Sequence, residues 1–246
     1  MKRNYKLEIC YDGSRYFGWE RQPNKETIQG KLEQVLARMT GQDAEVIGAG
    51  RTDAGVHAQK MIANTHLETD MSETEIQTYM NHYLPDDISV NDVRIASDRF
   101  HARYKATGKL YTYTCYTGSL KPVFRRKYVT VLEAVPDMDR MRAAAAILTG
   151  THDFKAFSTN PQMKKSTVRT VDKIEIAQKK DFLYLNFHGD GFLQNMVRIL
   201  TGTILEAGFG RMSEEQIREA LNTRDRALAG PTMPAQGLCL MEVDYD

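Results

Sequence analysis

The sequence predicts an α+β protein in which two halves of similar design each combine antiparallel strands with helices. Three observations predict this class. Short segments alternate apolar and polar residues with a period of two, which is typical of half-buried strands. Other segments place apolar residues three or four positions apart behind recognisable capping residues, which is typical of helices. Both kinds follow the order β-α-β-β-α-β, the split βαβ arrangement, and a similar order returns later in the chain.

The N-terminal half, residues 1–105, begins with an alternating strand that ends at an Asp-Gly-Ser turn. Its first helix starts at Thr27, carries apolar residues at helical spacing and stops before Gly41, a typical C-terminal residue. A capping box, Ser-Glu-Thr-Glu (72–75), starts the second helix, which we expect to reach Tyr83. The predicted strands of this half are residues 5–11, 44–50, 59–68 and 88–96.

The C-terminal half, residues 106–246, repeats this pattern, so we expect two ferredoxin-like halves. Because open sheets can join edge to edge and so lose exposed edges, both halves are predicted to share one continuous, mainly antiparallel sheet. We expect helices on one face of that sheet and an active-site cleft on the other. The predicted strands here are residues 109–117, 127–133, 167–178, 182–189 and 237–245, and the predicted helices are 137–150, 193–208 and one that follows Ser213.

The bulk composition limits the class of protein. A chain of 246 residues can bury a large core without help from a metal or a disulfide. Its three cysteines are far apart and odd in number, which argues against a zinc or disulfide framework and suits a reducing compartment. No apolar segment approaches the length of a membrane span, and the N-terminus lacks the apolar region of a secretion signal. We therefore expect a soluble cytoplasmic protein with no membrane partner.

The charge distribution is uneven, although the formal net charge is only +1. Between Arg94 and Lys127 the sequence has nine lysines and arginines against one acid, Asp98. Such a run is often only a solvated rim of the protein. Here, however, the cations alternate with histidine, phenylalanine and tyrosine, a combination that suits a surface that follows a nucleic-acid backbone and stacks on bases.

The segment VIGAGRTDAGVHA (46–58) is predicted to present a reactive carboxylate rather than to bind a nucleotide cofactor. Its glycine spacing matches neither phosphate-binding motif, and a strand follows it where those motifs need a helix N-terminus. Thr-Asp-Ala-Gly is also ordinary turn chemistry, which would make Asp53 structural. Yet the loop spends eight residues (48–55) where a hairpin needs two to five, and it holds Asp53 close to Arg51 beside small neighbours. These features favour a loop that a large ligand approaches closely.

The motif GRTDAGVHA (50–58) resembles the catalytic motif of the tRNA pseudouridine synthase A family. The resemblance runs nearly from end to end, because the other family segments occur in family order. These segments are YDGSRYFGW, TIQGKLEQVL, LPDDISV, RFHAR, KLYTY, THDFKAF, STVRTV, GFLQNMVRILTG and AGPTMPAQGLCLMEVDY. The resemblance implies an isomerase that converts uridine to pseudouridine at positions 38–40 of the tRNA anticodon stem-loop, without cofactor or metal.

The resemblance also implies roles for three catalytic residues. Asp53 corresponds to the essential carboxylate, which acts as nucleophile or base during exchange of the glycosidic bond. Arg198 corresponds to a helical arginine that keeps this carboxylate ionised and aimed, although an exposed arginine with no such role is the usual case for a helix. Tyr111 corresponds to the tyrosine that lies against the target base, whereas Tyr113 is expected to face the core.

Further residues are implied to bind the substrate. Arg51 corresponds to an arginine that helps to hold the target base out of the helical stack, and Leu238 to a residue of the substrate pocket. The implied contacts to the RNA backbone are His101, Arg103, Lys164, Lys165 and Arg169. The implied partners are the anticodon arm of tRNA and a second copy of the chain in a homodimer.

Two departures from the family pattern fall near the implied pocket. Residues 60–62 are Lys-Met-Ile where the family usually has Gly-Gln-Val, and Cys239 replaces an aromatic residue. Neither change touches the catalytic carboxylate.

The alternative interpretation is a non-catalytic RNA-binding protein of two ferredoxin-like units, which explains the basic segment but not the long loop that holds Arg51 and Asp53.

Overall fold

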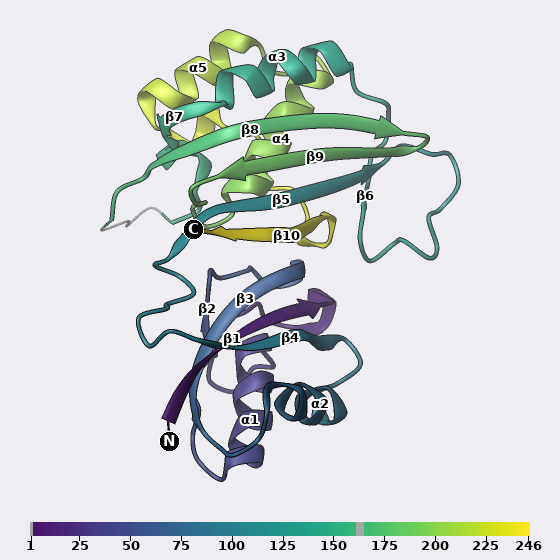
Figure 1. Ribbon diagram of the computed structural model, residues 1–246. Helices are drawn as coiled ribbons and strands as arrows, with labels where there is room; N and C mark the ends of the chain where they lie inside the picture. The colour runs from purple at the N-terminus through teal and green to yellow at the C-terminus, as the bar shows by residue number, and fades with distance from the viewer. Residues whose placement is uncertain (1, 161–164) are drawn as a thin grey trace. The chain divides into compact units, whose positions relative to one another are not determined.

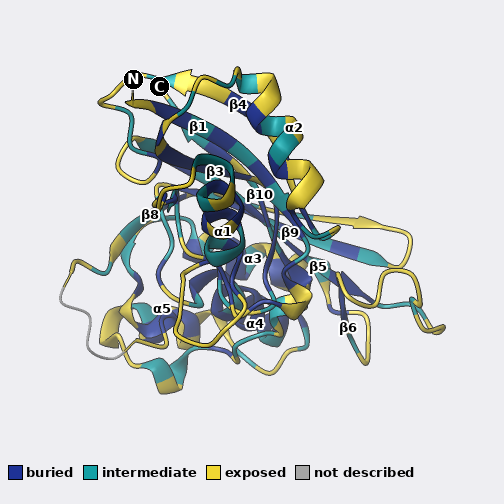
Figure 2. Ribbon diagram, turned by 90° about the horizontal axis from the view of Figure 1, so that it is seen from below, coloured by how far each residue is buried: buried dark blue, intermediate teal, exposed yellow. Residues whose placement is uncertain are grey.

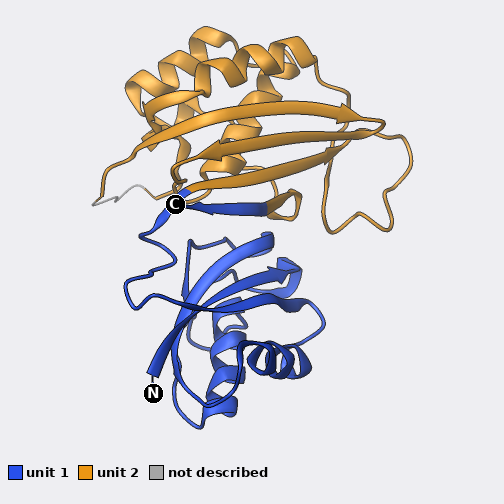
Figure 3. Cartoon of the chain, in the orientation of Figure 1, with its two compact units in different colours: residues 1–107, 240–246 blue, residues 108–239 orange. Residues whose placement is uncertain are grey.

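The computed structural model describes residues 2–160 and 165–246, and Figure 1 labels its helices and strands. The chain divides into two compact units, which are coloured separately in Figure 3. Unit 1 comprises Met1–Thr107 and Leu240–Asp246, and unit 2 comprises Gly108–Cys239. The predicted domains, residues 1–105 and 106–246, stay a prediction.

Unit 1 is built on an antiparallel sheet in which β1 lies between β3 and β4. The alternation of β1 buries Tyr5, Leu7 and Ile9, which form the centre of the core. Helices α1 and α2 pack beside each other below the strands in Figure 1. The elements of this unit are β1 (Lys2–Tyr11), α1 (Ile28–Thr40), β2 (Ile47–Gly48), β3 (His57–Glu68), α2 (Glu73–Tyr83) and β4 (Ile88–Ala96).

Unit 2 contains an antiparallel sheet with the order β5-β9-β8-β7. Helix α4 is buried along nearly its whole length, and Figure 2 shows buried residues gathered there and along the strands. The elements are β5 (Ala106–Tyr116), β6 (Thr130–Val131), α3 (Met138–Leu148), β7 (Gly150–Asp153), β8 (Val168–Lys179), β9 (Phe182–Gly189), α4 (Met196–Gly208) and α5 (Glu214–Thr223). Strand β10 (Leu238–Tyr245) begins in unit 2 and continues in unit 1.

The helix ends follow the capping residues that the sequence displays. Thr27 caps α1 by accepting a hydrogen bond from the amide of Gly30 at 3.3 Å, and Gly41 ends the helix in the left-handed conformation. Ser72 and Ser213 both form complete capping boxes, with Glu75 and with Gln216 respectively. The predicted starts of α1, α2 and α5 are therefore confirmed.

The predicted α+β class with a large, mainly antiparallel sheet is confirmed, but two predicted strands are much shorter than expected. The segment 44–50 contributes only the two residues of β2. The main chain of Val46 is occupied by α1 instead: its amide donates to Glu33 Oε1 at 3.1 Å, and its carbonyl accepts from Gln29 Nε2 at 3.1 Å. These bonds replace the ladder that a longer strand would need.

The predicted strand 127–133 is likewise reduced to the two residues of β6, which run parallel to the end of β5. A turn in which the Tyr128 amide donates to the Arg125 carbonyl delays the start of pairing. Strand β7 was not predicted, because its four residues are too short to show a period. Helix α4 begins at Met196 rather than at 193, because Asn195 adopts a left-handed conformation with φ of 60°.

In the parts of the chain that the structure describes, no helix combines the length and the apolar character that crossing a membrane requires.

Candidate active site

The loop that carries Asp53 joins β2 to β3 in unit 1. Asp53 is half-buried, and its carbonyl accepts a hydrogen bond from the amide of Val56 at 3.1 Å. This bond closes a four-residue turn in which Gly55 has φ of 80°, a conformation that favours glycine. The turn chemistry in the sequence is therefore real, and it holds the main chain of Asp53 at its first position.

The segment 11–19, which runs from the last residue of β1 into the connection to α1, braces this loop through its main chain. The amide of Trp19 donates to the Thr52 carbonyl at 3.1 Å, and the amide of Gly55 donates to the Tyr16 carbonyl at 3.3 Å. These bonds fix the residues on both sides of Asp53. Gly18 lies between the two contacts with φ of 89°, and a Cβ there would come within 2.5 Å of the Thr52 carbonyl oxygen. A side chain at this position would therefore push the loop away.

Side chains of the same segment complete the support. The hydroxyl groups of Tyr11 and Thr52 form a buried hydrogen bond of 2.8 Å. The indole of Trp19 packs against Gly48, where a Cβ would come within 2.5 Å of the ring. The glycine at 48 thus serves close packing of an aromatic ring rather than the approach of a phosphate.

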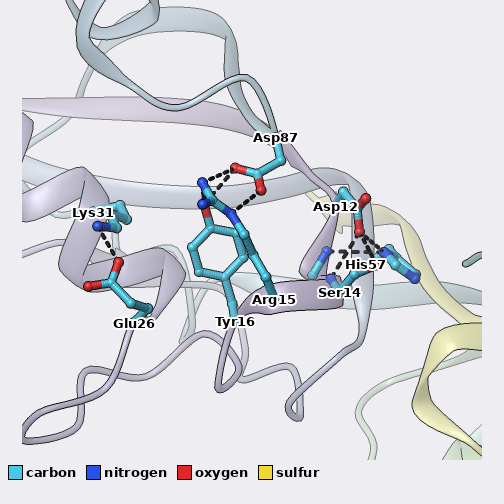
Figure 4. A network of polar contacts seen from close by, with 9 residues as sticks. Asp12, Ser14, Arg15, Tyr16, Glu26, Lys31, His57 and Asp87 are labelled. Carbon is cyan, nitrogen blue, oxygen red and sulfur yellow. Dashed lines mark hydrogen bonds and ion pairs between the residues drawn. The ribbon is translucent and has the colours of Figure 1, made fainter.

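A second contact anchors the C-terminal end of the loop, where β3 begins. His57 is buried, and its Nδ1 accepts a hydrogen bond from the amide of Gly13 at 3.0 Å, with Asp12 Oδ1 3.1 Å from the same nitrogen. Asp12 in turn accepts from the amide of Ser14 at 2.9 Å (Figure 4). The imidazole is therefore part of the scaffold that fixes the turn.

Tyr16 connects the loop to the segment that precedes β4, through the network in Figure 4. Its hydroxyl donates to Asp87 Oδ1 at 2.6 Å, and Arg15 forms a two-pronged ion pair with the same carboxylate. Partial burial alone would raise the pKa of Asp87, but the hydrogen bonds from Arg15 and Tyr16 outweigh it, so that this pKa is lowered. The charged carboxylate of Asp87 thus holds the side chain of Tyr16, and the main-chain carbonyl of the same tyrosine accepts from the amide of Gly55.

Arg51 lies in the loop but is exposed. Its Nη1 is 3.2 Å from Glu20 Oε2, and both side chains are more than half exposed. Exposed pairs of this kind contribute little free energy, about 0–1 kcal/mol. The guanidinium can therefore leave Glu20 for a substrate at small cost.

In unit 2, β5 carries Tyr111 and Tyr113 on one face. Tyr111 is 8% exposed, and its ring and that of Phe192 are nearly perpendicular, with centroids 5.4 Å apart. Tyr113 is fully buried, and its hydroxyl bonds to Thr130 Oγ1 at 2.6 Å and to the Pro234 carbonyl at 2.7 Å. Burial raises the pKa of Tyr113, so that the hydroxyl stays protonated and keeps both bonds.

Arg198 is half-buried on the first turn of α4. Its Nε donates to the Met233 carbonyl at 2.6 Å, and its Nη1 donates to Asn195 Oδ1 at 2.5 Å. Asn195 is itself held, because its amide group donates to Thr159 Oγ1 at 2.7 Å. The direction of the guanidinium is therefore set by the chain around it.

We call residues 230–237 the strap, because this segment ties α4 to β5. Its Met233 carbonyl accepts from Arg198, and the neighbouring Pro234 carbonyl accepts from Tyr113. The strap lies so close to α4 that a Cβ on Gly202 would come within 2.0 Å of the Pro231 carbonyl oxygen. The strap leads directly into Leu238, which is 5% exposed at the start of β10.

The predicted RNA contacts fall in both units. His101 and Arg103 belong to a turn of unit 1 in which His101 Nδ1 accepts from the amide of Arg103 at 3.2 Å. This turn is fixed from inside the core, because buried Asn64 accepts from the amide of Ala102 at 2.8 Å and donates to Asn4 at 3.1 Å.

The other predicted RNA contacts belong to unit 2. Lys165 is exposed, and Arg169 on β8 is half-buried with its guanidinium bonded to the carbonyls of Ser166 and Val168. Lys164 lies outside the described residues.

The structure brings Arg51 and Asp53 together in one loop and His101 and Arg103 together in one turn, all in unit 1. Arg198, Tyr111 and Leu238 belong to unit 2, so the pairing of Asp53 with Arg198 stays a prediction.

Sequence analysis missed the residues that hold the loop and the strap in place. The most prominent of these are Tyr11, Tyr16, Trp19 and Asp87 around the loop, and Tyr113 at the strap. The signal in the sequence was the segment 11–19, which has four aromatic residues and two glycines and yet neither the period of a strand nor that of a helix. A conformation of this kind needs partners elsewhere, and here they are in the loop.

Comparisons with known proteins match nearly the whole chain to tRNA pseudouridine synthases. Residues 9–105 and 144–246 match a family model described as tRNA pseudouridine synthase. The tRNA pseudouridine synthase A of Clostridium kluyveri is 42% identical over 243 residues, which cover 99% of this chain and 100% of that protein. The tRNA pseudouridine synthase A of Bacillus sp. (strain KSM-64) is 44% identical over 243 residues, which cover 98% of this chain and 99% of the relative.

Among solved structures, one chain in a crystal structure of a Cbf5-Nop10-Gar1 complex is similar over 96% of this chain and 58% of its own length. The identity is 11% and the TM-score 0.36, a similarity too low to support any conclusion about function.

Proposed function

The chain belongs to the tRNA pseudouridine synthase family and is an isomerase that acts on uridine in tRNA, and from this premise we propose how its residues carry the reaction. Asp53 is the catalytic carboxylate, Arg198 is its ion-pair partner, and Tyr111 lies against the target base. The single observation that carries this proposal is the bracing of Asp53, whose neighbours Thr52 and Gly55 are both bonded to the segment 11–19. Family membership also removes the support for a non-catalytic RNA-binding protein.

The reaction needs a group that acts where the base leaves the ribose. The bond from ribose carbon 1 to ring nitrogen 1 breaks, the base turns, and ring carbon 5 forms the new bond to the same ribose carbon. The proton on carbon 5 is released, and nitrogen 1 gains a proton. A carboxylate can serve as nucleophile or base at such a centre without any cofactor.

The electrostatic role of Arg198 follows from what burial does to a carboxylate. Binding of the substrate removes water from around Asp53, and this desolvation alone would raise the pKa of the carboxyl group and leave it protonated. A guanidinium at short range favours the charged form of the carboxylate, and its planar group of donors can also orient the two carboxylate oxygens. The bonds from Arg198 to Met233 and Asn195 support this role, because they hold the guanidinium in one direction before substrate binds.

The proposed target is a uridine at positions 38–40 of the anticodon stem-loop. The base must leave its stack to reach the carboxylate, which costs a few kcal/mol and least where stacking is loose. Arg51 supports that step as an exposed cation beside Asp53 whose pair with Glu20 is easily broken. His101, Arg103, Lys164, Lys165 and Arg169 are proposed to contact the RNA backbone, and Leu238 to line the pocket.

The working form is proposed to be a cytoplasmic homodimer that uses no nucleotide cofactor. Widely spaced cysteines in odd number support a reducing compartment. A tRNA is long enough to span two subunits, which supports a dimer as the binding unit.

The experiment that tests Asp53 measures release of tritium from carbon 5 of uridine in a labelled tRNA transcript. Asp53→Asn is expected to lower the rate by at least about 1,000-fold, as loss of a catalytic nucleophile does, while tRNA affinity stays near that of the wild type. Asp43→Asn, at an exposed acid of the same unit, is the matched control and keeps full activity. If Asp53→Asn releases tritium at the wild-type rate, Asp53 is not the catalytic carboxylate.

A further inference from the structure

The loop between β5 and β6, residues 118–128, has a surface that neither the fold nor the proposed catalytic residues use. It is the teal segment beside the label β6 in Figure 1. It contains four cations and no acid between Gly118 and Leu132. The cations are Lys121, Arg125, Arg126 and Lys127, and the structure exposes all of them.

Apolar side chains of the same loop are also in water. Phe124 is 95% exposed, Leu120 79% and Val123 56%. A phenylalanine that is almost fully exposed gains nothing for the fold of the chain. Apolar side chains that stand out together in this way are typical of a binding surface.

The loop has an ordered conformation despite this exposure. Its main chain makes successive turns, with the Arg125 amide bonded to the Pro122 carbonyl at 2.8 Å and the Tyr128 amide bonded to the Arg125 carbonyl at 2.8 Å. Within the loop Arg126 donates to the Val123 carbonyl at 2.7 Å. These bonds hold Phe124 outward before any partner arrives, and a preformed surface loses less entropy on binding.

Both ends of the loop are anchored to unit 2. The Thr117 amide donates to the Asp181 carbonyl at 2.8 Å, and Gln236 Nε2 donates to the Val129 carbonyl at 2.9 Å. Arg125 also lies over the ring of Phe182, 5.8 Å from its centroid. Gln236 belongs to the strap, whose Met233 carbonyl also accepts from Arg198. The strap therefore holds both this loop and Arg198.

From these observations we propose that the 118–128 loop is a tRNA-binding surface, on which cations contact backbone phosphates and Phe124 stacks on an unstacked base. The combination of cations and an exposed ring is what single-stranded and loop regions of RNA require. The proposal rests on the proposed function, because it assigns a further contact to the same substrate.

The position of the loop agrees with this role. It follows β5, the strand that carries Tyr111 and ends five residues past it, at Tyr116. At the rise of a strand this separation is roughly 16 Å. A duplex arm carries a phosphate charge about every 2 Å along its axis, so several phosphates lie within that distance of the target uridine.

Charge favours RNA over a second copy of the chain as the occupant. In a two-fold dimer, a loop that lies on the symmetry axis faces the same loop of the other copy. Two loops in contact would therefore bring eight cations together with no acid between Gly118 and Leu132 of either copy. A polyanion with exposed base faces meets the cations and the apolar side chains at once.

The test measures binding of an unmodified tRNA transcript to the full-length protein over a series of salt concentrations. Lys121→Gln/Arg125→Gln is expected to reduce the slope of log affinity against log salt by roughly 1.4 to 1.8, the effect of two lost phosphate contacts. Phe124→Ser is expected to raise Kd by about tenfold, the effect of one lost stacking contact.

The matched control is Arg142→Gln/Arg218→Gln. It removes the same charge from exposed helix positions of unit 2, where each arginine already pairs with an acid, Asp139 and Glu214 respectively. Its salt slope and Kd are expected to stay within about twofold of the wild type, since these charges touch no phosphate.

Three outcomes would overturn the proposal. Loop variants could bind tRNA with the wild-type slope and Kd, or they could lose no more affinity than the control. Alternatively, sedimentation could show that the loop variants turn a larger species into a monomer while tRNA affinity for each copy is unchanged, which would assign the loop to contacts between copies.

Tritium release separates a failure of this proposal from a failure of the proposed function. The loop variants are expected to raise KM and to leave kcat within about twofold at saturating tRNA. The lost contacts stabilise bound substrate and transition state equally, so their loss weakens binding without slowing the chemical step. A wild-type enzyme that releases no tritium contradicts the proposed function, whereas an active wild type with unchanged loop variants contradicts only the loop assignment.

Discussion

Replacing Asp87 by asparagine tests whether the network around Tyr16 supports the catalytic loop. The substitution keeps the size of the side chain and an oxygen that can accept from the Tyr16 hydroxyl, which lies 2.6 Å from Asp87 Oδ1. It removes the negative charge that pairs with Arg15 and strengthens the hydrogen bond from Tyr16. The ion pair itself contributes little, because the Arg15 side chain is 60% exposed and its charge is screened by water. Loss of the charged acceptor weakens the hydrogen bond from Tyr16 by about 1 kcal/mol. We expect Asp87→Asn to lower the free energy of unfolding by about 1–2 kcal/mol at pH 7.

The pH dependence of this loss has a definite sign. The pKa of Asp87 is lowered in the folded chain, so its carboxylate stabilises the fold above the pKa of the unfolded state, about 3.9. That stability is lost as the pH falls through the folded pKa. The difference between wild type and Asp87→Asn in urea denaturation is therefore expected to be constant from pH 7 to 5 and to shrink below about pH 4.

The same variant has a predicted kinetic effect. Tyr16 braces Gly55, two residues from Asp53, so a looser Tyr16 displaces the carboxylate. We expect kcat for tritium release to fall by about tenfold, less than the roughly 100-fold that a misplacement of 1 Å produces.

Asp92→Asn is the control for this prediction, since Asp92 pairs with Arg94 at the surface of the same unit. It is expected to change neither stability nor kcat appreciably. Unfolding curves of Asp87→Asn and wild type that coincide at pH 7, or a gap that widens below pH 4, would refute the reasoning.

Three other substitutions test the strap and the predicted RNA-binding turn. Gly202→Ala should push the strap from α4, because the added Cβ falls 2.0 Å from the Pro231 carbonyl oxygen; we expect a loss of about 1–3 kcal/mol in urea denaturation and a lower kcat. Tyr113→Phe leaves the Pro234 carbonyl without its hydroxyl partner and should cost about 1–3 kcal/mol. Because burial raises the pKa of Tyr113, that deficit should shrink above about pH 10, where the wild type itself loses stability. Asn64→Ala removes the side chain that accepts from the Ala102 amide and should raise Kd for tRNA more than it lowers kcat.

Controls for these substitutions are available in the chain. Gly41→Ala adds a methyl group where nothing lies within 4 Å, so it reports only the cost of the left-handed conformation. Tyr104→Phe removes a hydroxyl from a ring that is 73% exposed and should leave stability unchanged. The argument for the strap is wrong if Gly202→Ala retains full kcat, and the argument for the turn is wrong if Asn64→Ala binds tRNA normally.

The elements that the sequence predicts well are those whose signals are local. Ser72 and Ser213 each display their partner three residues later, and the predicted capping boxes form. Residues 88–96 and 182–189 alternate cleanly and become β4 and β9 with the predicted bounds. In these segments each residue needs only its neighbours in sequence to express its preference.

The elements that the sequence predicts poorly depend on distant partners. Val46 looks like a strand residue, but Glu33 and Gln29 on α1 take its main-chain groups. Asn195 lies in a helical pattern, yet it adopts a left-handed conformation and bonds to Thr159 and Arg198. No local period encodes such contacts.

The candidate site shows the same division. Asp53 and Arg51 stand out in the sequence because a long loop with three glycines is unusual between strands. The groups that hold that loop do not stand out, because Tyr11 looks like an ordinary strand residue and Tyr16 and Trp19 come from a segment with no regular period. The resemblance to a family supplied the catalytic residues, whereas the supporting residues needed the structure.

The bracing of the Asp53 loop has a consequence for mutational scanning. Its principal contacts join main-chain atoms, from Trp19 to Thr52 and from Gly55 to Tyr16, and truncating a side chain leaves such atoms in place. An alanine scan therefore does not report these two bonds, and the losses that it finds at Tyr11, Tyr16 and Trp19 measure only their buried side chains. The sensitive positions are Gly18 and Gly48, where alanine is the larger residue and its methyl group would enter space already filled by a carbonyl oxygen or an indole ring.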